Sequence, residues 1–193
     1  MKMSLMLTTL PASEPVSIAE LREYLRLAAD ADDVLLSEMV KAARGICEGF
    51  TGRCFIAQGY SLFLDAFPQS GEISLPRRPF LALDFVKTHA PDGAATEDDP
   101  ARYEVDIAGG RLSLKAGVLP PQTVKRQGGI EIGFTAGYGA AAEHVPAALR
   151  QAVLRVAADL YEKRGDMQSP PGSVILRSGA AGLLQPFRTM GLE

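Results

Sequence analysis

The sequence predicts an α+β fold: a helical core, an inserted antiparallel β region and an extended C-terminal tail. Apolar residues recur every three or four positions in residues 18–28, 34–50 and 146–163, as in amphipathic helices. Between residues 56 and 135 the period changes to two, which is typical of strands. Since no helical pattern separates these strands, they favour an antiparallel sheet or small barrel over a doubly wound sheet.

Composition sets wide bounds on the function. The chain has 193 residues, 47% of them apolar and 22% charged, which suits one soluble domain, or one domain with a large insertion. A net charge of −3 gives no sign of a surface that binds polyanions. No apolar run reaches the roughly 18 residues of a membrane span, and no signal peptide is evident at residues 1–12. Cys47 and Cys54 are expected to be reduced thiols of a protein made in the cytoplasm.

The N-terminal part, residues 1–55, is predicted to contain an extended arm and two helices. The arm covers residues 1–16, and Ser17 and Glu20 form a capping box at the start of the first helix. The second helix, residues 34–50, is predicted to end at Gly52. Its inward stripe is Leu36, Met39, Val40, Ala43, Ile46, Cys47 and Phe50, with Glu38, Lys41, Arg44 and Glu48 pointing outward.

The inserted part, residues 56–136, is predicted to hold about six short strands. A hairpin is expected across Gly109 and Gly110, where glycines suit a tight turn. Residues 90–100 are acidic and rich in alanine, so we expect a loop there. The last strand, residues 130–135, alternates apolar and polar or small side chains and leads directly into the returning helix.

The returning part, residues 137–164, is predicted to close the helical core. Gly137 and Gly139 break the strand, and Pro146 suits the first helical position. The apolar stripe of this helix comprises Leu149, Ala152, Val153, Val156 and Leu160. The only other strong helical patterns are N-terminal, so the helix is expected to pack against them.

The C-terminal part, residues 165–193, is predicted to be a flexible connector and a docking tail. Residues 165–182 contain two prolines, four glycines and three serines, a composition that favours a connector. The apolar residues that follow mark a contact surface, so we expect the tail to become ordered on assembly. The alternative is a tail folded back over its own helices.

No catalytic, cofactor-binding or metal-binding constellation is predicted. The aspartates of residues 30–33 do not fit an EF-hand register, since Lys41 would stand where the bidentate Glu belongs. Gly137 and Gly139 match part of a dinucleotide fingerprint, but Pro146 starts the helix too late. Cys47 lies on an inward helical stripe and is interpreted as a core thiol. His89 and His144 have no metal-ligand spacing with the cysteines.

The ordered set of segments resembles the head–tail connector (adaptor) proteins of tailed phages and prophages, in the long form with a β insertion. The resemblance spans nearly the whole chain, although each motif alone is weak. Arg78 departs from it by standing where a second proline is common. The residues that carry it are Pro15 to Leu21, Leu25-Arg26, Ala42-Ala43-Arg44, Thr51-Gly52-Arg53, Leu75-Pro76-Arg77, Phe134 to Gly139, Val145-Pro146, Tyr161 to Arg164, and Leu183 to Arg188.

The resemblance implies a structural protein and no enzyme. Such adaptors form a ring, usually of twelve copies, that bridges the portal protein to the next neck ring or tail-terminator protein, with DNA passing through the lumen. Gene transfer agents use the same kind of protein, so the expected location is the neck of a virion or phage-like particle, after synthesis of the protein in the bacterial cytoplasm. No membrane and no cofactor are implied. The residues expected to dock on the portal are Leu183, Leu184, Pro186, Phe187, Arg188, Met190 and Leu192.

The alternative hypothesis is a non-catalytic ligand- or carbohydrate-binding β module on a helical scaffold. A cluster of exposed aromatic residues would favour it. The chain has eight phenylalanines, five tyrosines and no tryptophan, so the sequence gives this alternative little support.

Overall fold

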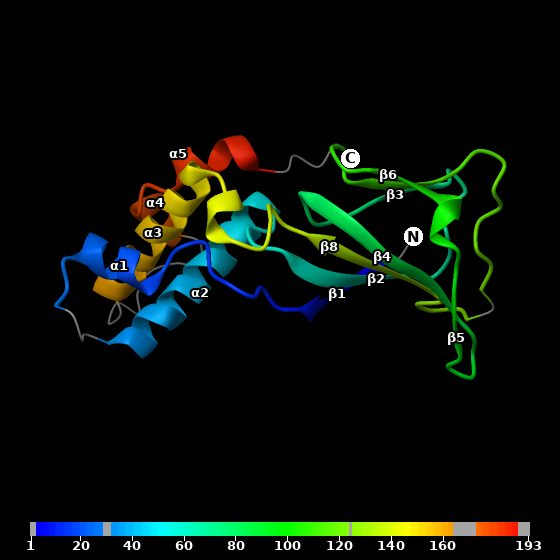
Figure 1. The fold of residues 1–193 in the computed structure, drawn as a ribbon, viewed down its shortest axis with the longest axis horizontal. Helices are drawn as coiled ribbons and strands as arrows, with labels where there is room; N and C mark the ends of the chain where they lie inside the picture. The colour runs from blue at the N-terminus through cyan, green and yellow to red at the C-terminus, as the bar shows by residue number, and fades with distance from the viewer. Residues whose placement is uncertain (1–2, 29–31, 124, 164–172, 189–193) are drawn as a thin grey trace. The chain divides into compact units, whose positions relative to one another are not determined.

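The computed structural model describes residues 3–28, 32–123, 125–163 and 173–188, and it confirms the α+β class (Figure 1). The chain divides into two compact units. The sheet unit comprises Met1–Pro11 and Ala57–Gly137, and the helical unit comprises Ala12–Ile56 and Tyr138–Glu193. Among the described helices, none is both long enough and apolar enough to cross a bilayer.

The sheet unit is built on a five-stranded antiparallel sheet with the order β1-β2-β8-β4-β5. Its central strand, β8, is the segment that the sequence placed at the end of the inserted region. Leu62, Ile132 and Val86 stand side by side on neighbouring strands, and all three are buried. The strands are β1 (Met3–Thr9), β2 (Gln58–Leu64), β4 (Phe80–His89), β5 (Ala95–Glu97) and β8 (Ile130–Ala136).

A second, three-stranded sheet has the order β3-β7-β6. Its strands are β3 (Glu72–Ser74), β6 (Tyr103–Asp106) and β7 (Arg111–Leu114). The predicted hairpin across Gly109 and Gly110 is confirmed, since β6 pairs with β7 in antiparallel fashion and Gly110 adopts a φ of 60°. Ile73 and Leu112, paired across β3 and β7, are both buried.

Two strands lie where the sequence predicted none. Residues 1–16 were expected to be an arm that belonged with the helices, but Met3–Thr9 forms β1 and pairs with β2 of the sheet unit. Residues 90–100 were expected to be a loop, but Ala95–Glu97 pairs with the end of β4. Both are edge strands, which depend on a neighbouring strand more than on their own apolar alternation.

One close approach explains a glycine in the central strand. A Cβ atom on Gly133 would lie 2.3 Å from Cε1 of Phe85, which stands opposite it on β4. The aromatic ring therefore occupies the space that a side chain on β8 would need. The Lys87 ammonium in turn lies 3.9 Å from the centre of the Phe85 ring, within the range of a cation–π contact.

In the helical unit, α1 (Ile18–Leu25), α2 (Asp33–Thr51) and α3 (Ala147–Glu162) form the scaffold. The capping box is confirmed: the Glu20 amide donates to Ser17 Oγ at 3.1 Å, and the Ser17 amide donates to Glu20 Oε2 at 2.8 Å. The α1 helix ends three residues before the predicted residue 28, because Arg26 takes a left-handed conformation. Gly52 ends α2 with a φ of 71°, as expected of a helix-terminating glycine.

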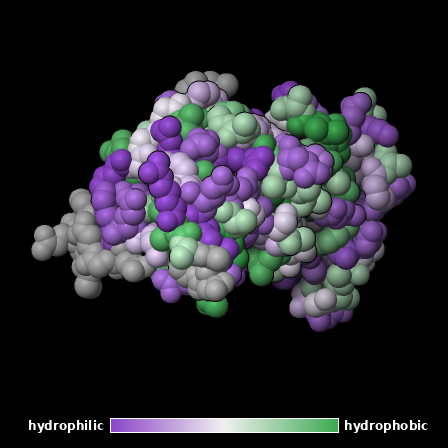
Figure 2. All heavy atoms as spheres, turned by 60° about the vertical axis from the view of Figure 1, so that its left-hand side comes forward, coloured by the Kyte–Doolittle hydropathy of each residue, from purple (hydrophilic) through white to green (hydrophobic). Residues whose placement is uncertain are grey.

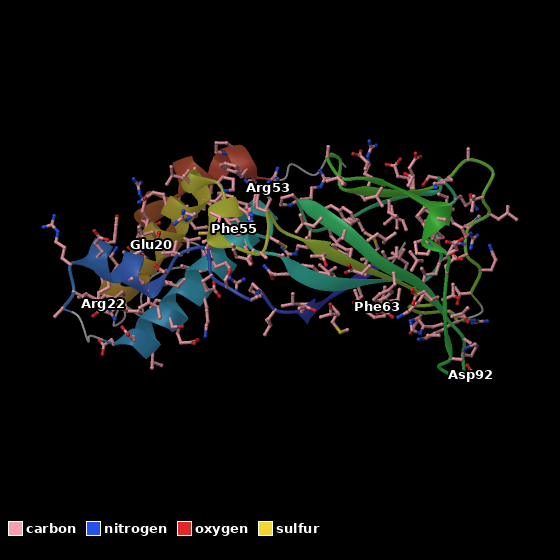
Figure 3. All side chains as sticks on the ribbon, viewed as in Figure 1. Glu20, Arg22, Arg53, Phe55, Phe63 and Asp92 are labelled. Carbon is pink, nitrogen blue, oxygen red and sulfur yellow. The ribbon has the colours of Figure 1, made fainter. Side chains whose placement is uncertain are left out.

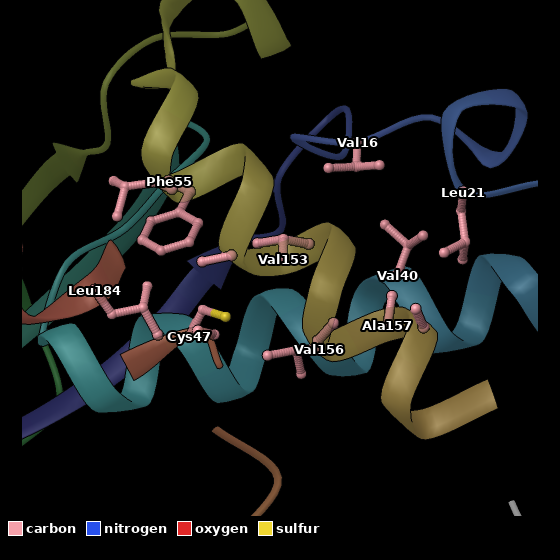
Figure 4. Close-up of a cluster of buried hydrophobic side chains, with 14 of the residues drawn as sticks. Val16, Leu21, Val40, Cys47, Phe55, Val153, Val156, Ala157 and Leu184 are labelled. Carbon is pink, nitrogen blue, oxygen red and sulfur yellow. The ribbon is translucent and has the colours of Figure 1, made fainter. Parts of the chain in front are cut away.

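The apolar stripes of α2 and α3 pack against each other in one core (Figure 4). Figure 2 shows hydrophilic side chains over much of the helical unit, as expected of helices that bury one face only. Pro146 is the N-cap residue, so α3 begins one position later than predicted. The fully or nearly buried core residues of the unit are Val16, Leu21, Leu36, Val40, Ala43, Cys47, Phe55, Ile56, Val145, Leu149, Ala152, Val153, Val156, Ala157, Ala158, Val174, Ile175, Ala180 and Leu184.

The predicted outward positions of Arg44 and Glu48 are wrong. The Arg44 guanidinium donates to Glu14 Oε2 at 2.7 Å and to Glu48 Oε2 at 2.9 Å, and Glu48 is buried. Burial alone would lower the pKa of Arg44, but Glu14 and Glu48 raise it above its usual range. Glu48 also accepts the Phe55 amide at 2.7 Å. Arg44 and Glu48 can face inward because each forms hydrogen bonds there.

Replacing Val153 with Asp is expected to unfold the helical unit. The side chain is fully buried between the helices, so the variant would place an unpaired carboxylate in the core at a cost of several kcal/mol. Val34→Asp is the matched control, because Val34 is 82% exposed in the first turn of α2 and should change stability by about 0.5 kcal/mol or less. Urea unfolding followed by circular dichroism measures both. Equal losses of stability at the two positions would show that Val153 is not part of the core.

Candidate functional site

A polar cluster that the sequence did not indicate joins three strands of the sheet unit. Ser61 Oγ donates to Glu131 Oε1 at 2.7 Å, and His89 Nε2 lies 2.8 Å from Glu131 Oε2. A serine nucleophile is activated by a histidine that lies between it and the carboxylate. Here the carboxylate lies in the middle, so the histidine is not placed to take the serine proton. The geometry suits a structural cross-strand bridge between β2, β8 and the end of β4.

Neither cysteine is placed as a nucleophile. Neither Cys47 nor Cys54 forms a disulfide bond, and both are buried. Burial raises the pKa of Cys47 to about 12, and the nearby Glu48 charge adds to the effect, so this thiol stays protonated at neutral pH. Within the described parts of the chain, no group of three or more His, Cys, Asp or Glu side chains is arranged to hold a metal ion.

The glycines after β8 do not form a dinucleotide cradle. A Cβ atom on Gly139 would lie 2.4 Å from His144 Nδ1, so the histidine ring fills the space beside this glycine. A short 3₁₀ turn, Ala142–His144, separates Gly139 from the first residue of α3, Ala147. The positive end of the helix therefore does not directly follow the glycines, as the phosphate-binding turn of a Rossmann fold requires.

The C-terminal segment is the candidate site that the sequence predicted, and the structure folds part of it onto the helical unit. It forms α4 (Ser173–Arg177), α5 (Ala181–Leu184) and a 3₁₀ turn, Gln185–Phe187. Leu184 is fully buried beside Cys47 and Phe55 (Figure 4). The expectation of a tail ordered only on assembly is therefore wrong for residues 183–188. Leu183 and Phe187 are half-buried, whereas Pro186 and Arg188 are exposed.

An ionic cluster attaches α4 to the end of α3. Asp159, which is nearly buried, accepts hydrogen bonds from Lys163 Nζ at 2.7 Å and from Arg177 at 2.9 Å. Burial works to raise the pKa of Asp159, but the hydrogen bonds and charges of Lys163 and Arg177 lower it below its usual range. The α4 helix also contributes Val174 and Ile175, which are both buried, to the core of the helical unit.

Two arginines hold the last described residues in place. Arg53 Nε donates to the carbonyl oxygen of Phe187 at 2.6 Å, and Figure 3 labels this arginine after the end of α2. The Arg188 guanidinium lies 5.4 Å from the centre of the Phe50 ring, a cation–π distance. Of the residues predicted to dock, Leu183, Leu184, Pro186, Phe187 and Arg188 are thus brought together. Met190 and Leu192 lie outside the described residues.

The fold matches chains from structures of gene transfer agent particles, two of them structures of the neck. One, from "Neck of empty GTA particle computed with C6 symmetry", is 28% identical, with a TM-score of 0.81 over 98% of this chain and 97% of that chain. Another, from "Virion of native gene transfer agent (GTA) particle", is 27% identical with the same score and coverage. A third, from "Neck of native GTA particle computed with C12 symmetry", is 28% identical, with a TM-score of 0.77 over 97% of each chain.

The similarity extends over 97–98% of this chain and is not confined to one motif. The likeness includes both the helical unit and the sheet unit, because nearly all of each chain is covered. No family model and no curated protein match the sequence. The likeness is therefore to solved structures, and it covers 97% of each matched chain.

Leu184→Ala is expected to destabilise the helical unit by about 2–5 kcal/mol, the usual range for a buried leucine. Arg188→Ala should have a much smaller effect, since Arg188 is exposed and loses one cation–π contact of about 0.5–1 kcal/mol. Thermal and urea unfolding of both variants provide the test. A Leu184→Ala variant as stable as the wild type would show that this segment does not pack on the helices.

The Asp159 cluster is expected to make stability depend on pH. Because the folded-state pKa of Asp159 is lowered, its contribution is present above the unfolded value, about 3.9, and is lost as the pH falls through the folded value. Asp159→Asn should therefore reduce the free energy of unfolding at pH 6 and reduce it less at pH 2.5. Urea titrations of both proteins at the two pH values measure this difference. An equal gap at both pH values would contradict it.

Proposed function

We propose that this protein is a structural component of the neck of a phage-like particle such as a gene transfer agent. The observation that supports the proposal most strongly is the match to neck chains over 97–98% of both partners at 27–28% identity. The sequence resemblance to head–tail adaptors points to the same place in the particle, on motifs that span both units. The role is mechanical and not catalytic.

Within the neck, we assign the chain to the adaptor ring between the portal and the next neck ring or tail-terminator protein. The cyclic symmetry of two of the matched assemblies, sixfold in one and twelvefold in the other, supports a ring of identical copies. Twelve copies satisfy both symmetries. DNA would pass through the lumen without being read, which fits a chain with a net charge of −3.

The portal contact is assigned to the C-terminal segment. Pro186 and Arg188 are exposed, and Leu183 and Phe187 keep part of their surface open. Met190 and Leu192 follow with further apolar side chains, each able to contribute roughly 1.5–3 kcal/mol if buried by a partner. Leu184 is assigned a different role, since it is buried in its own core and anchors the segment.

Multiple copies strengthen such a contact. A single segment with a few apolar side chains gives modest affinity after its ordering cost. A ring presents one segment per copy, so the later contacts form at a high effective concentration. Arg188 can add a charge-assisted hydrogen bond to a carboxylate or carbonyl of the portal. Ring assembly should therefore strengthen portal binding, and portal binding should stabilise the ring.

The alternative of a carbohydrate-binding β module receives little support from the sheet unit. A hollow of about 400 Å³ lies beside β1, and its lining includes one aromatic side chain, Phe63. Sugar rings are generally bound between or upon several aromatic faces with converging polar groups. We therefore retain the structural role as the proposed function.

The direct experiment is electron microscopy of the purified protein, alone and with the portal protein of the same particle. Rings stacked on the portal are the expected result. A protein that stays monomeric with the portal present and is absent from purified particles would refute the neck assignment.

Truncation after Arg188 tests the docking segment without removing its anchor. The variant keeps Leu184 and the Arg53–Phe187 hydrogen bond, so its melting temperature should stay within about 2 °C of the wild type. Loss of Met190 and Leu192 should weaken portal binding about tenfold or more, given the contribution of each buried side chain. Co-sedimentation with the portal measures it. Undiminished binding by the truncated chain would overturn the docking role, even if rings still form.

A further inference from the structure

The first strand of the sheet unit has an open edge. β1 pairs with β2 on one side and ends the order β1-β2-β8-β4-β5, so in the described part of the sheet no strand covers its other side. An edge strand presents backbone N–H and C=O groups that a further strand can use. Seven residues long, β1 is long enough to accept one.

The side chains of β1 do not protect this edge. The strand reads MSLMLTT and carries no charge and no proline. Met3 is 52% exposed, Met6 is 51% exposed and Leu7 is 44% exposed, so apolar side chains are open on both faces of the strand. Soluble proteins usually block such an edge with lysine, proline or a short strand. The opposite edge follows that rule, since β5 has three residues and its Glu97 lies 3.6 Å from Lys87 Nζ.

A hollow of about 400 Å³ adjoins the first residues of β1. It is lined by Met3, Ser4, Phe63, Asp65, Gln127 and Gly128, all from the sheet unit. Asp65 accepts the Gly128 amide at 3.0 Å, which fixes one wall. Strand addition obtains its affinity from backbone hydrogen bonds and its specificity from pockets that receive alternate side chains. The edge and the hollow together provide both parts of such a site.

We propose that the β1 edge and its adjoining hollow bind an extended segment of a second copy of this chain, forming the contact between neighbours in the ring. This inference rests on the proposed neck function. The second copy is the occupant because matched chains come from assemblies of sixfold and twelvefold cyclic symmetry. In a cyclic ring of more than two copies, each neighbour contact joins two different surfaces. The segment that docks on β1 is therefore not the neighbour's own β1.

The test compares the self-assembly of Met6→Lys with that of Leu119→Lys. Met6 lies on the β1 edge, whereas Leu119 is 79% exposed in a loop of the same unit and serves as the matched control. A lysine on the edge would have to be buried by the incoming strand, so the concentration for half assembly should rise about tenfold or more. Leu119→Lys should assemble like the wild type. Sedimentation and negative-stain images measure assembly, and circular dichroism checks the fold.

Hydrogen exchange on the unmodified protein provides a second measurement that does not depend on any variant. Amides in residues 3–9 should be protected in assembled rings relative to dilute monomer, with no such change at residues 116–119. If rings form but Met6→Lys assembles normally, or if residues 3–9 gain no protection, the β1 proposal is wrong and the neck function stands. If Met6→Lys loses only portal binding, the occupant is the portal and the proposal is wrong. If the wild type forms no ring with the portal, both fail.

Discussion

The helical unit depends on the burial of the α3 stripe against α2. Val40 and Cys47 on one helix and Val153 and Val156 on the other are almost completely removed from water. The apolar face of each helix is covered mainly by the other helix. The α1, α4 and α5 helices pack around this pair. Leu21 and Leu184 extend the same core at its margins. A close-packed core of this kind fixes the positions of the surface residues of the helical unit.

Local signals in the sequence predicted most of the scaffold. Ser17 and Glu20 specify the start of α1 through their own side chains, and Gly52 ends α2 because it can adopt a positive φ. The edge strand β1 was missed because it forms only by pairing with β2, about 50 residues later in the chain. Arg44 and Glu48 were placed outward because helical periodicity does not reveal the partners of a charged side chain. Arg44 binds both Glu48 and Glu14, and Glu14 lies 30 residues before Arg44 in the chain.

The C-terminal segment shows how composition can mislead about packing. Residues 165–182 are rich in glycine, proline and serine, yet Val174, Ile175 and Ala180 are buried. The contacts that hold them, such as Arg177 with Asp159, join residues that no local pattern connects. The sequence predicted a tail that becomes ordered on assembly, but Leu184 is buried in the core of its own helical unit. Leu184 anchors the segment to the helical unit, whereas Pro186 and Arg188 beyond it are exposed. A segment already held in place loses less conformational entropy when it docks.

The separation of α2 from α3 along the chain also affects how the protein is made. Roughly 100 residues separate the two stripes, and ribosomes add about 5–20 residues per second, so α2 emerges about 5–20 s before its partner. During that interval its apolar face has only the short α1 to cover it. The β1 strand is synthesised even earlier, and it stays unpaired until β2 has been made. The apolar face of α2 and the edge of β1 are therefore exposed before either unit has folded. Premature association is most favoured at this stage, between nascent chains on neighbouring ribosomes.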